Sequence, residues 1–163
     1  MEPRGSFAAY RAAAKASQIL AGIHVSLRWK FNPKTCPADG ILVQLGDDTP
    51  SAEHPGALAY TTPYGARRIV VFYDRVSTAV AHAQEPSLFG YVLAHEITHV
   101  VQGMITHSET GIMKEKWTAR DFAEMHRDRL RFTPEDIELV DLGLRHAGPS
   151  PALRNSAAAT GTR

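Results

Sequence analysis

The pattern of apolar and polar positions predicts a helix followed by strands in the first half of the chain. Residues 7–20 are rich in alanine, with Ser6 as a candidate N-cap and Gly22 as the stop signal, and so predict a helix. Between residues 23 and 29, apolar side chains alternate with others, which is the period of a half-buried strand. The chain is therefore expected to pass from a helix directly into a strand.

Three more segments have the character of strands. Residues 41–45 predict a second strand, and residues 57–61 predict a short edge strand. Residues 68–73 are almost continuously apolar, which is typical of a strand buried on both faces at the centre of a sheet. Turn-forming residues at 32–40 and 64–65 separate these segments.

The second half of the chain is predicted to be helical. Four helices are expected, over residues 76–83, 87–102, 117–129 and 134–146. Pro86 opens the second of them, and Thr133 and Pro134 supply a cap and a first-turn proline for the last. Residues 147–163, rich in proline, serine and alanine, predict a disordered tail.

These elements predict one α+β domain over residues 1–146. The length of 163 residues suits a single core, and the net charge of +1 with interspersed signs implies no nucleic-acid partner. Cys36 is the sole cysteine and cannot form an internal disulfide. No apolar stretch is long enough to span a membrane. We expect the protein to be a monomer.

The chemistry is concentrated in one run, residues 93–99, which reads LAHEITH. On a helix His95 and His99 lie one turn apart and about 40° from each other, so both rings can bind one metal ion with Glu96 beside them. The competing interpretation is an amphipathic helix with polar residues on its rim. The surrounding apolar residues indicate a buried helix, where two histidines and a glutamate need compensation that a metal supplies.

The residues that follow complete a ligand set. Gly103 comes four residues after His99, where a helix can end in a left-handed glycine, and the reversed chain can bring His107 back to the ion. A catalytic zinc takes three protein ligands and keeps a fourth position open for water, and the three histidines fill the first three. The next residues predict a tight turn that places Met113 beneath the site.

On these residues the chain resembles the metzincin class of zinc metalloproteases, and His107 and Ser108 followed by a methionine are most similar to the matrixin branch. The class pattern is HExxHxxGxxH and then a methionine turn. Here the glycine and the third histidine come eight and twelve residues after the first histidine, rather than seven and ten. The wider pattern HExxHxxxGxxxHSxxGxM followed by tryptophan, here Trp117, is similar to short uncharacterised bacterial metzincin-like proteins.

The resemblance covers about residues 68–140 and is strong from residue 93 to residue 117. It implies a metzincin-like fold: a small, twisted, mostly parallel sheet with an antiparallel edge strand lining a cleft, a central zinc-binding helix and C-terminal helices. Metzincin-like proteins are usually exported, whereas the first residues written here lack a secretory signal. The protein is then expected to act inside the cell, or in the periplasm or outside if the true start lies upstream.

The expected activity is a zinc-dependent endopeptidase with one catalytic Zn²⁺, which lowers the pKa of a bound water and polarises the peptide carbonyl. Glu96 is expected to take the proton of the water as general base and to pass it to the leaving amine. The substrate is a peptide or protein, added as an extended segment along the edge strand at residues 57–61.

Two alternatives stay open. In a gluzincin-type metallopeptidase the third ligand is a glutamate from a later helix, and Glu115 and Glu124 are the candidates. The other alternative is a catalytically inactive zinc-binding or interaction module of the same fold. The presence of Glu96 argues against it, because a structural zinc site has a fourth protein ligand and needs no base. Trp117 is interpreted as a buried structural residue rather than a wall of the pocket.

Overall fold

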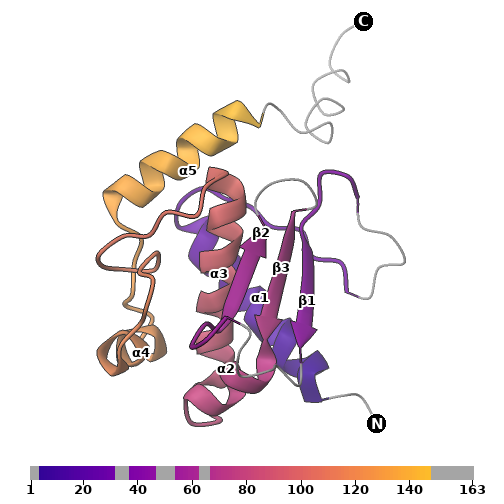
Figure 1. Cartoon of the computed structure of the whole chain (residues 1–163), viewed down its shortest axis with the longest axis vertical. Coiled ribbons are helices and arrows are strands. Elements are labelled where there is room, and N and C mark those ends of the chain that lie inside the picture. The colour runs from indigo at the N-terminus through magenta and orange to yellow at the C-terminus, as the bar shows by residue number, and fades with distance from the viewer. Residues whose placement is uncertain (1–3, 32–36, 47–53, 63–66, 148–163) are drawn as a thin grey trace, which may run out of the picture.

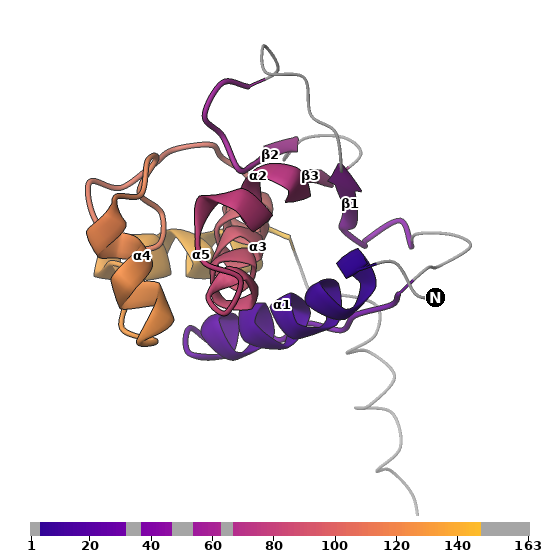
Figure 2. The ribbon, with the colours of Figure 1, turned by 90° about the horizontal axis from the view of Figure 1, so that it is seen from below.

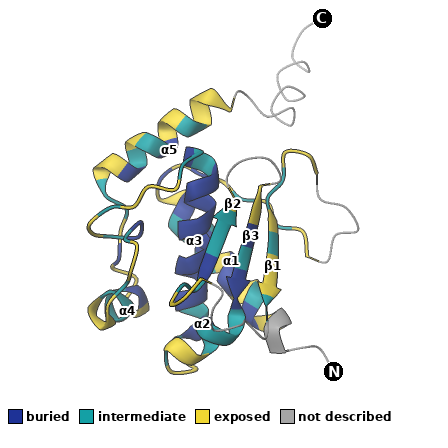
Figure 3. Ribbon diagram, in the orientation of Figure 1, coloured by how far each residue is buried: buried dark blue, intermediate teal, exposed yellow. Residues whose placement is uncertain are grey.

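One central helix organises the fold, and the other elements pack around it. The structure is a computed structural model that describes residues 4–31, 37–46, 54–62 and 67–147. Its elements in chain order are α1 (Arg4–Ala21), β1 (Leu42–Gly46), β2 (Ala59–Thr62), β3 (Arg68–Phe72), α2 (Tyr73–Ala79), α3 (Glu85–Gln102), α4 (Ala119–His126) and α5 (Pro134–His146). Helix α3 is buried along nearly its whole length, as Figure 3 shows.

Helix α3 lies between α1 on one side and the sheet on the other, with α4 and α5 covering a third side (Figures 1 and 2). The α1–α3 contact is close because small residues face each other: Ala12 and Ala16 of α1 are fully buried. A Cβ on Gly90 of α3 would lie 2.3 Å from Cγ of Lys15. This close packing fixes the position of the helix that carries the HExxH residues.

The sheet has three strands in the order β1–β3–β2 among the described residues. Strands β1 and β3 are parallel, with Val43 opposite Ile69, whereas β2 is antiparallel to β3, with Ala59 opposite Val71. Three residues of the central strand β3 are buried, which confirms the prediction of a central strand there. The predicted edge strand is also confirmed as β2, and the sheet is small and mixed.

The strand predicted over residues 23–29 is wrong. This segment forms no ladder, and His24 has a φ of 63°, outside the extended region. The alternation is nevertheless real: Ile23 and Val25 are buried while their neighbours are exposed. The segment runs back along α1, where Trp29 Nε1 donates to Ser17 Oγ at 2.8 Å. Its period of two therefore comes from one-sided burial of a segment that begins in a turn, not from pairing in the sheet.

The boundaries of helices α1, α2 and α4 also differ from the prediction. Helix α1 begins at Arg4, so Ser6 lies inside the helix and is not its N-cap, although the stop at Gly22 is confirmed. Helix α2 begins at Tyr73, directly after β3, and ends at Ala79, so the helix predicted over residues 76–83 is displaced towards the N-terminus. Helix α4 is shorter than the predicted segment because Thr118 caps it and Arg127 ends it.

The two C-terminal helices begin with the same capping device. Thr118 and Asp121 form a capping box at α4, and Thr133 and Asp136 form one at α5. Helix α5 then crosses the C-terminal end of α3 (Figure 1), and a Cβ on Gly143 would lie 2.0 Å from a backbone oxygen of α3. The predicted start of α5 after Thr133 is confirmed.

The predicted fold class, α+β, is confirmed, with five helices and the three-stranded mixed sheet in the described part. None of the described helices has both the length and the apolar character that a transmembrane span requires. The tail predicted over residues 147–163 lies outside the described residues except for residue 147, as does the turn predicted at residues 64–65.

Candidate metal centre

Helix α3 supplies three of the predicted site residues from two successive turns. His95, Glu96 and His99 are all buried, with exposed fractions of 6, 7 and 4%. The four-residue spacing places the histidine rings against each other, edge to face, with centroids 4.7 Å apart. The helix thus presents two imidazoles at a single point, as its sequence spacing predicts.

Gly103 ends the helix as expected. Its φ of 68° is in the left-handed region, and its N–H donates to the carbonyl of His99. The chain then reverses, and the carbonyl of Met104 comes to lie 3.0 Å from Nδ1 of His99. The helix end therefore both redirects the chain and fixes one of the imidazoles.

The segment after the reversal is held as a tight turn. Ser108 N–H donates to the carbonyl of Met113 at 2.9 Å, and Ile112 N–H donates to the carbonyl of Arg131, also at 2.9 Å. Gly111 has a φ of 78°, and a Cβ there would lie 2.4 Å from the same Arg131 oxygen. Met113 is buried at the end of this turn. The predicted tight turn is thus present, with Met113 buried in it.

The backbone fixes the tautomers of the two buried histidines. Nδ1 of His95 lies 2.8 Å from the carbonyl oxygen of Ile112, and Nδ1 of His99 faces the carbonyl of Met104. A carbonyl can only accept, so each Nδ1 carries the hydrogen. In a neutral imidazole the other nitrogen, Nε2, then has a free lone pair.

Those two lone pairs point at each other. Nε2 of His95 and Nε2 of His99 are 3.0 Å apart, with no hydrogen available to either when both rings are neutral. Two acceptors this close repel each other unless a cation lies between them. Zinc at about 2.0–2.1 Å from each nitrogen in a tetrahedral site places such nitrogens roughly 3.3 Å apart. The geometry of the pair therefore fits a bound metal ion.

His107 joins the pair from the loop. Its ring centroid is 5.0 Å from that of His99 and 5.4 Å from that of His95. One ligand atom from each of the three histidines can be chosen so that all lie within 4.8 Å of one another. His107 is exposed, unlike the other two, so the group is open to solvent on its side. The structure brings the three predicted ligands together and shows that they could hold a metal ion.

Burial keeps the two helix histidines neutral. Desolvation, together with the charges of His99 and His107, lowers the pKa of His95 to about 3, whereas the Ile112 carbonyl acts in the opposite direction. Desolvation and then the charge of His107 lower the pKa of His99 to about 4, whereas the Met104 carbonyl and the charge of Asp136 act in the opposite direction. Neutral imidazole is the form that binds a metal.

Glu96 lies in an environment suited to proton transfer. Burial raises the pKa of its carboxyl group to about 7, and only a hydrogen bond from the Thr61 side chain acts against that. The Thr61 hydroxyl also lies 3.4 Å from the backbone oxygen of Glu96. Strand β2 therefore lies directly beside the candidate base, which places an edge strand next to the histidines.

The glutamates considered as third ligands lie elsewhere. Glu115 is exposed, and Glu124 lies 3.7 Å from the guanidinium of Arg127. In the described part of the chain, the potential metal-binding group contains the three histidines and neither of these residues. This arrangement favours His107 over a glutamate as the third ligand.

Two features of the site were not foreseen from the sequence. Trp117 is only half-buried, and its ring stands edge to face against His95 with centroids 5.4 Å apart, while its buried Nε1 has no hydrogen-bond partner among the described residues. Asp136 is buried and binds Ser108, the residue after His107. The capping box at α5 was its only sequence signal.

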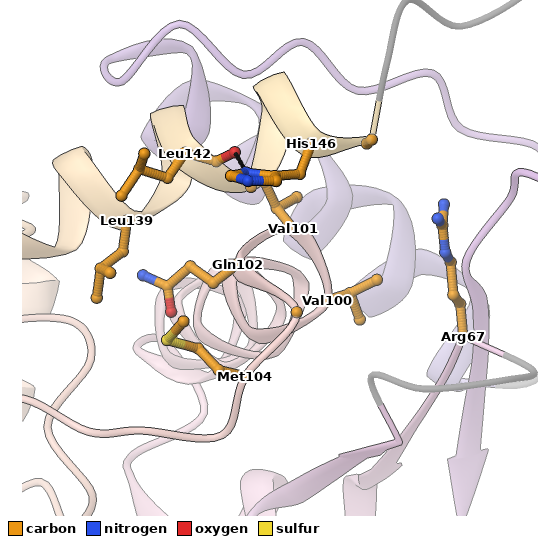
Figure 4. Close-up of a pocket in the computed structure, with 11 residues that line it drawn as sticks. Arg67, Val100, Val101, Gln102, Met104, Leu139, Leu142 and His146 are labelled. Atoms are coloured by element: carbon orange, nitrogen blue, oxygen red, sulfur yellow. Dashed lines mark hydrogen bonds between the residues drawn. The ribbon is translucent and has the colours of Figure 1, made fainter.

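The described part of the chain has a cavity of about 420 Å³ away from the histidines. Figure 4 shows it between the C-terminal end of α3 and helix α5, with Val101, Gln102, Met104 and Leu142 among its lining residues. None of the three histidines lines it. We assign the chemistry to the histidine group, because the cavity holds none of the three clustered histidines and its only imidazole is that of His146.

Comparison of the chain with models of protein families, with curated proteins and with solved structures gives no match. The site is therefore interpreted from its own geometry.

Proposed function

We propose that the protein is a zinc-dependent endopeptidase with a metzincin-like active site. The observation that carries the proposal is the opposed pair of Nε2 atoms 3.0 Å apart on His95 and His99, each imidazole oriented by a backbone carbonyl through Nδ1. Such outer-sphere hydrogen bonds are typical of metal-binding histidines. His107 supplies the third nitrogen from the solvent side.

The number of ligands separates a catalytic from a structural site. A structural zinc is enclosed by four protein ligands, whereas a catalytic zinc has three and an open position. The group in the described residues has three members, and its third member is exposed. Beside it stands Glu96, a buried carboxylate that a structural site does not need. These features favour catalysis over an inactive metal-binding module.

Bound zinc would supply a Lewis acid that polarises the scissile carbonyl and lowers the pKa of a bound water to near neutrality. Glu96, with a pKa raised to about 7 by burial, would accept a proton from the attacking water. The same carboxyl group would then donate that proton to the leaving amine. The apolar surroundings of α3 limit competing water around the carboxylate.

Strand β2 supports a peptide as the substrate. It is an edge strand among the described residues, paired on one side with β3. Its Thr61 contacts Glu96, so a peptide added along the free edge would pass close to the histidines. Main-chain hydrogen bonds would hold such a segment extended, which presents its carbonyl groups in a regular order.

The test uses the full chain loaded with one equivalent of zinc and an unbiased peptide library. We expect cleavage that a chelator abolishes and added zinc restores. Glu96→Gln is the matched control, because it keeps the size of the side chain and cannot accept a proton. A zinc-loaded wild type that cleaves no peptide would contradict the peptidase assignment and favour a metal-binding module. Cleavage that persists in the chelated protein would contradict the metal mechanism.

A further inference from the structure

Asp136 is a buried carboxylate with an unusual set of partners. Its exposed fraction is 3%, and in the described part of the chain it forms no ion pair. One oxygen accepts the hydroxyl of Ser108 at 2.5 Å, and the other accepts the backbone N–H of Thr133 at 2.9 Å. A buried carboxylate without a cationic partner is costly, so its position calls for a compensating charge.

The hydrogen bond to Ser108 connects this carboxylate to the loop ligand. Ser108 directly follows His107, and its backbone N–H is held by the carbonyl of Met113. With the side chain held by Asp136, Ser108 is fixed at both ends. The backbone that directly follows His107 is therefore anchored on α5, although the ring of His107 itself is exposed.

A second connection runs to the helix ligands. The backbone carbonyl of Asp136 accepts Nε2 of Gln102 at 3.2 Å, and Gln102 is the last residue of α3, three residues after His99. Figure 4 shows the Gln102 side chain at this end of α3, below α5. Asp136 thus contacts both segments that carry the histidines.

The charge of Asp136 also acts on this site. Asp136 lies behind both segments that carry the histidines, hydrogen-bonded to Ser108 and to Gln102. A dication held by three neutral imidazoles leaves a net positive charge in a partly buried place. A buried carboxylate behind the ligands offsets that charge. The attraction is stronger there than in water, because the effective dielectric constant of the protein interior is lower.

We propose that Asp136 is the outer-sphere carboxylate of this metal centre: it positions His107 through Ser108, and its negative charge favours binding of the dication. Outer-sphere partners of this kind change metal affinity by about 10–100-fold. The inference rests on the proposed zinc site but not on peptidase activity. Asp136 is a positioning residue, because it does not touch the reacting groups.

The test measures zinc affinity of the full chain by competition with a chromophoric chelator. Asp136→Asn removes the charge but keeps the size and an acceptor for Thr133, and we expect affinity to fall about 10–100-fold. Ser108→Ala removes the connection to the loop and keeps the charge, and we expect weaker binding there too. Ser108→Thr keeps a hydroxyl and should restore affinity.

The chain offers a matched control in the second capping box. Asp121 occupies the same place in α4 and binds Thr118 and Lys114 rather than Ser108. Asp121→Asn should leave zinc affinity unchanged. Equal weakening by Asp121→Asn and Asp136→Asn would overturn the inference, because the effect would then come from helix capping in general.

A spectroscopic measurement separates positioning from simple stability. Cobalt(II) replaces zinc in such sites, and its visible absorption bands report the arrangement of the ligands. We expect Ser108→Ala to change these bands and Ser108→Thr to restore them. Unchanged bands and affinity in Ser108→Ala would overturn the positioning role, and this variant decides if Asp136→Asn does not fold.

The outcomes distinguish this inference from the proposed function. A wild type that binds zinc, with an equal affinity in Asp136→Asn, overturns the inference alone. A wild type that binds no zinc overturns both the metal site and the inference. Weaker binding in Asp136→Asn and Ser108→Ala, with Asp121→Asn unaffected, supports the inference whether or not any peptide is cleaved.

Discussion

The imidazoles of His95 and His99 stand edge to face with their Nε2 atoms 3.0 Å apart. Each ring is held through Nδ1 by a backbone carbonyl, so neither ring can turn away without losing that hydrogen bond. The fold therefore holds two lone pairs against each other before any ligand arrives. This preorganisation favours a cation, because binding relieves the repulsion and requires little reordering of the side chains.

Replacing His107 tests the third ligand. His107→Ala should weaken zinc binding by more than about 100-fold, because loss of an outer-sphere partner alone costs up to that amount. His126→Ala is the control, since His126 is exposed on α4 and outside the group. Competition with a chelator gives both affinities. An unchanged affinity in His107→Ala would show that another residue completes the site.

Glu96→Gln should separate binding from chemistry. The variant is expected to keep one zinc per chain and to lose about 10²–10⁴-fold in kcat, which is the typical contribution of a general base. Zinc content and turnover of the same sample provide the measurement. Wild-type turnover in this variant would remove Glu96 from the mechanism.

The metal-free protein should become more stable as the pH rises from about 4.5 to 6.5. His95 and His99 have pKa values lowered to about 3 and 4, so in this window they are protonated only in the unfolded chain. Glu96 has a pKa raised to about 7, so in the same window it is protonated only in the folded chain. Over these three groups, the unfolded state binds one proton more than the folded state. The free energy of unfolding therefore rises by about 1.4 kcal/mol per pH unit.

The variant Glu96→Gln isolates the contribution of Glu96 to the pH dependence of stability, which opposes that of the two histidines. The raised pKa of Glu96 stabilises the folded protein at low pH, and this stabilisation is lost progressively as the pH rises from the ordinary value of 4.5 to about 7. Without it, the slope between pH 4.5 and 6.5 should steepen by about 1.4 kcal/mol per pH unit. Denaturant unfolding of both metal-free proteins at several pH values gives the slopes. Parallel curves would place the Glu96 carboxyl in water rather than in the protein interior.

Gly143→Ala tests the crossing of α5 over α3. Alanine normally favours a helix interior over glycine by about 1 kcal/mol. Here the added Cβ would lie 2.0 Å from the backbone oxygen of Val101, so α5 must move. We expect a destabilisation of about 1–3 kcal/mol in denaturant unfolding. Gly103→Ala is the comparison, because a Cβ there meets nothing within 4 Å and costs only backbone strain. A Gly143→Ala protein as stable as the wild type would contradict the close crossing.

The sequence predicted the metal-binding residues well because their information is local. A four-residue spacing on a helix determines which side chains share a face, and a left-handed glycine determines where the chain can reverse. His95, His99 and Gly103 follow from these two rules, and the structure places His107 with them. Strands β2 and β3 were also predicted from local information, because the order of apolar residues along the sequence indicates which positions of a strand are buried.

The features of the fold and the site that were not predicted depend on contacts between segments far apart in the sequence. Residues 23–29 alternate in burial as a strand does, yet no other strand pairs with them, and alternation alone cannot reveal a missing partner. Asp136 is 41 residues from His95 in sequence, and nothing near it predicts a contact with Ser108. The ring of Trp117 lies against that of His95, 22 residues earlier in the sequence. Such contacts follow from tertiary packing rather than from local patterns.

The most direct test of the central claim is X-ray absorption at the zinc edge of the loaded wild-type protein. We predict one zinc per chain, bound by three imidazole nitrogens at about 2.0–2.1 Å and one further light atom, with one imidazole fewer in His107→Ala. A wild-type protein that retains no zinc, or whose zinc has only two imidazole ligands, would contradict the claim that His95, His99 and His107 form a three-histidine metal centre.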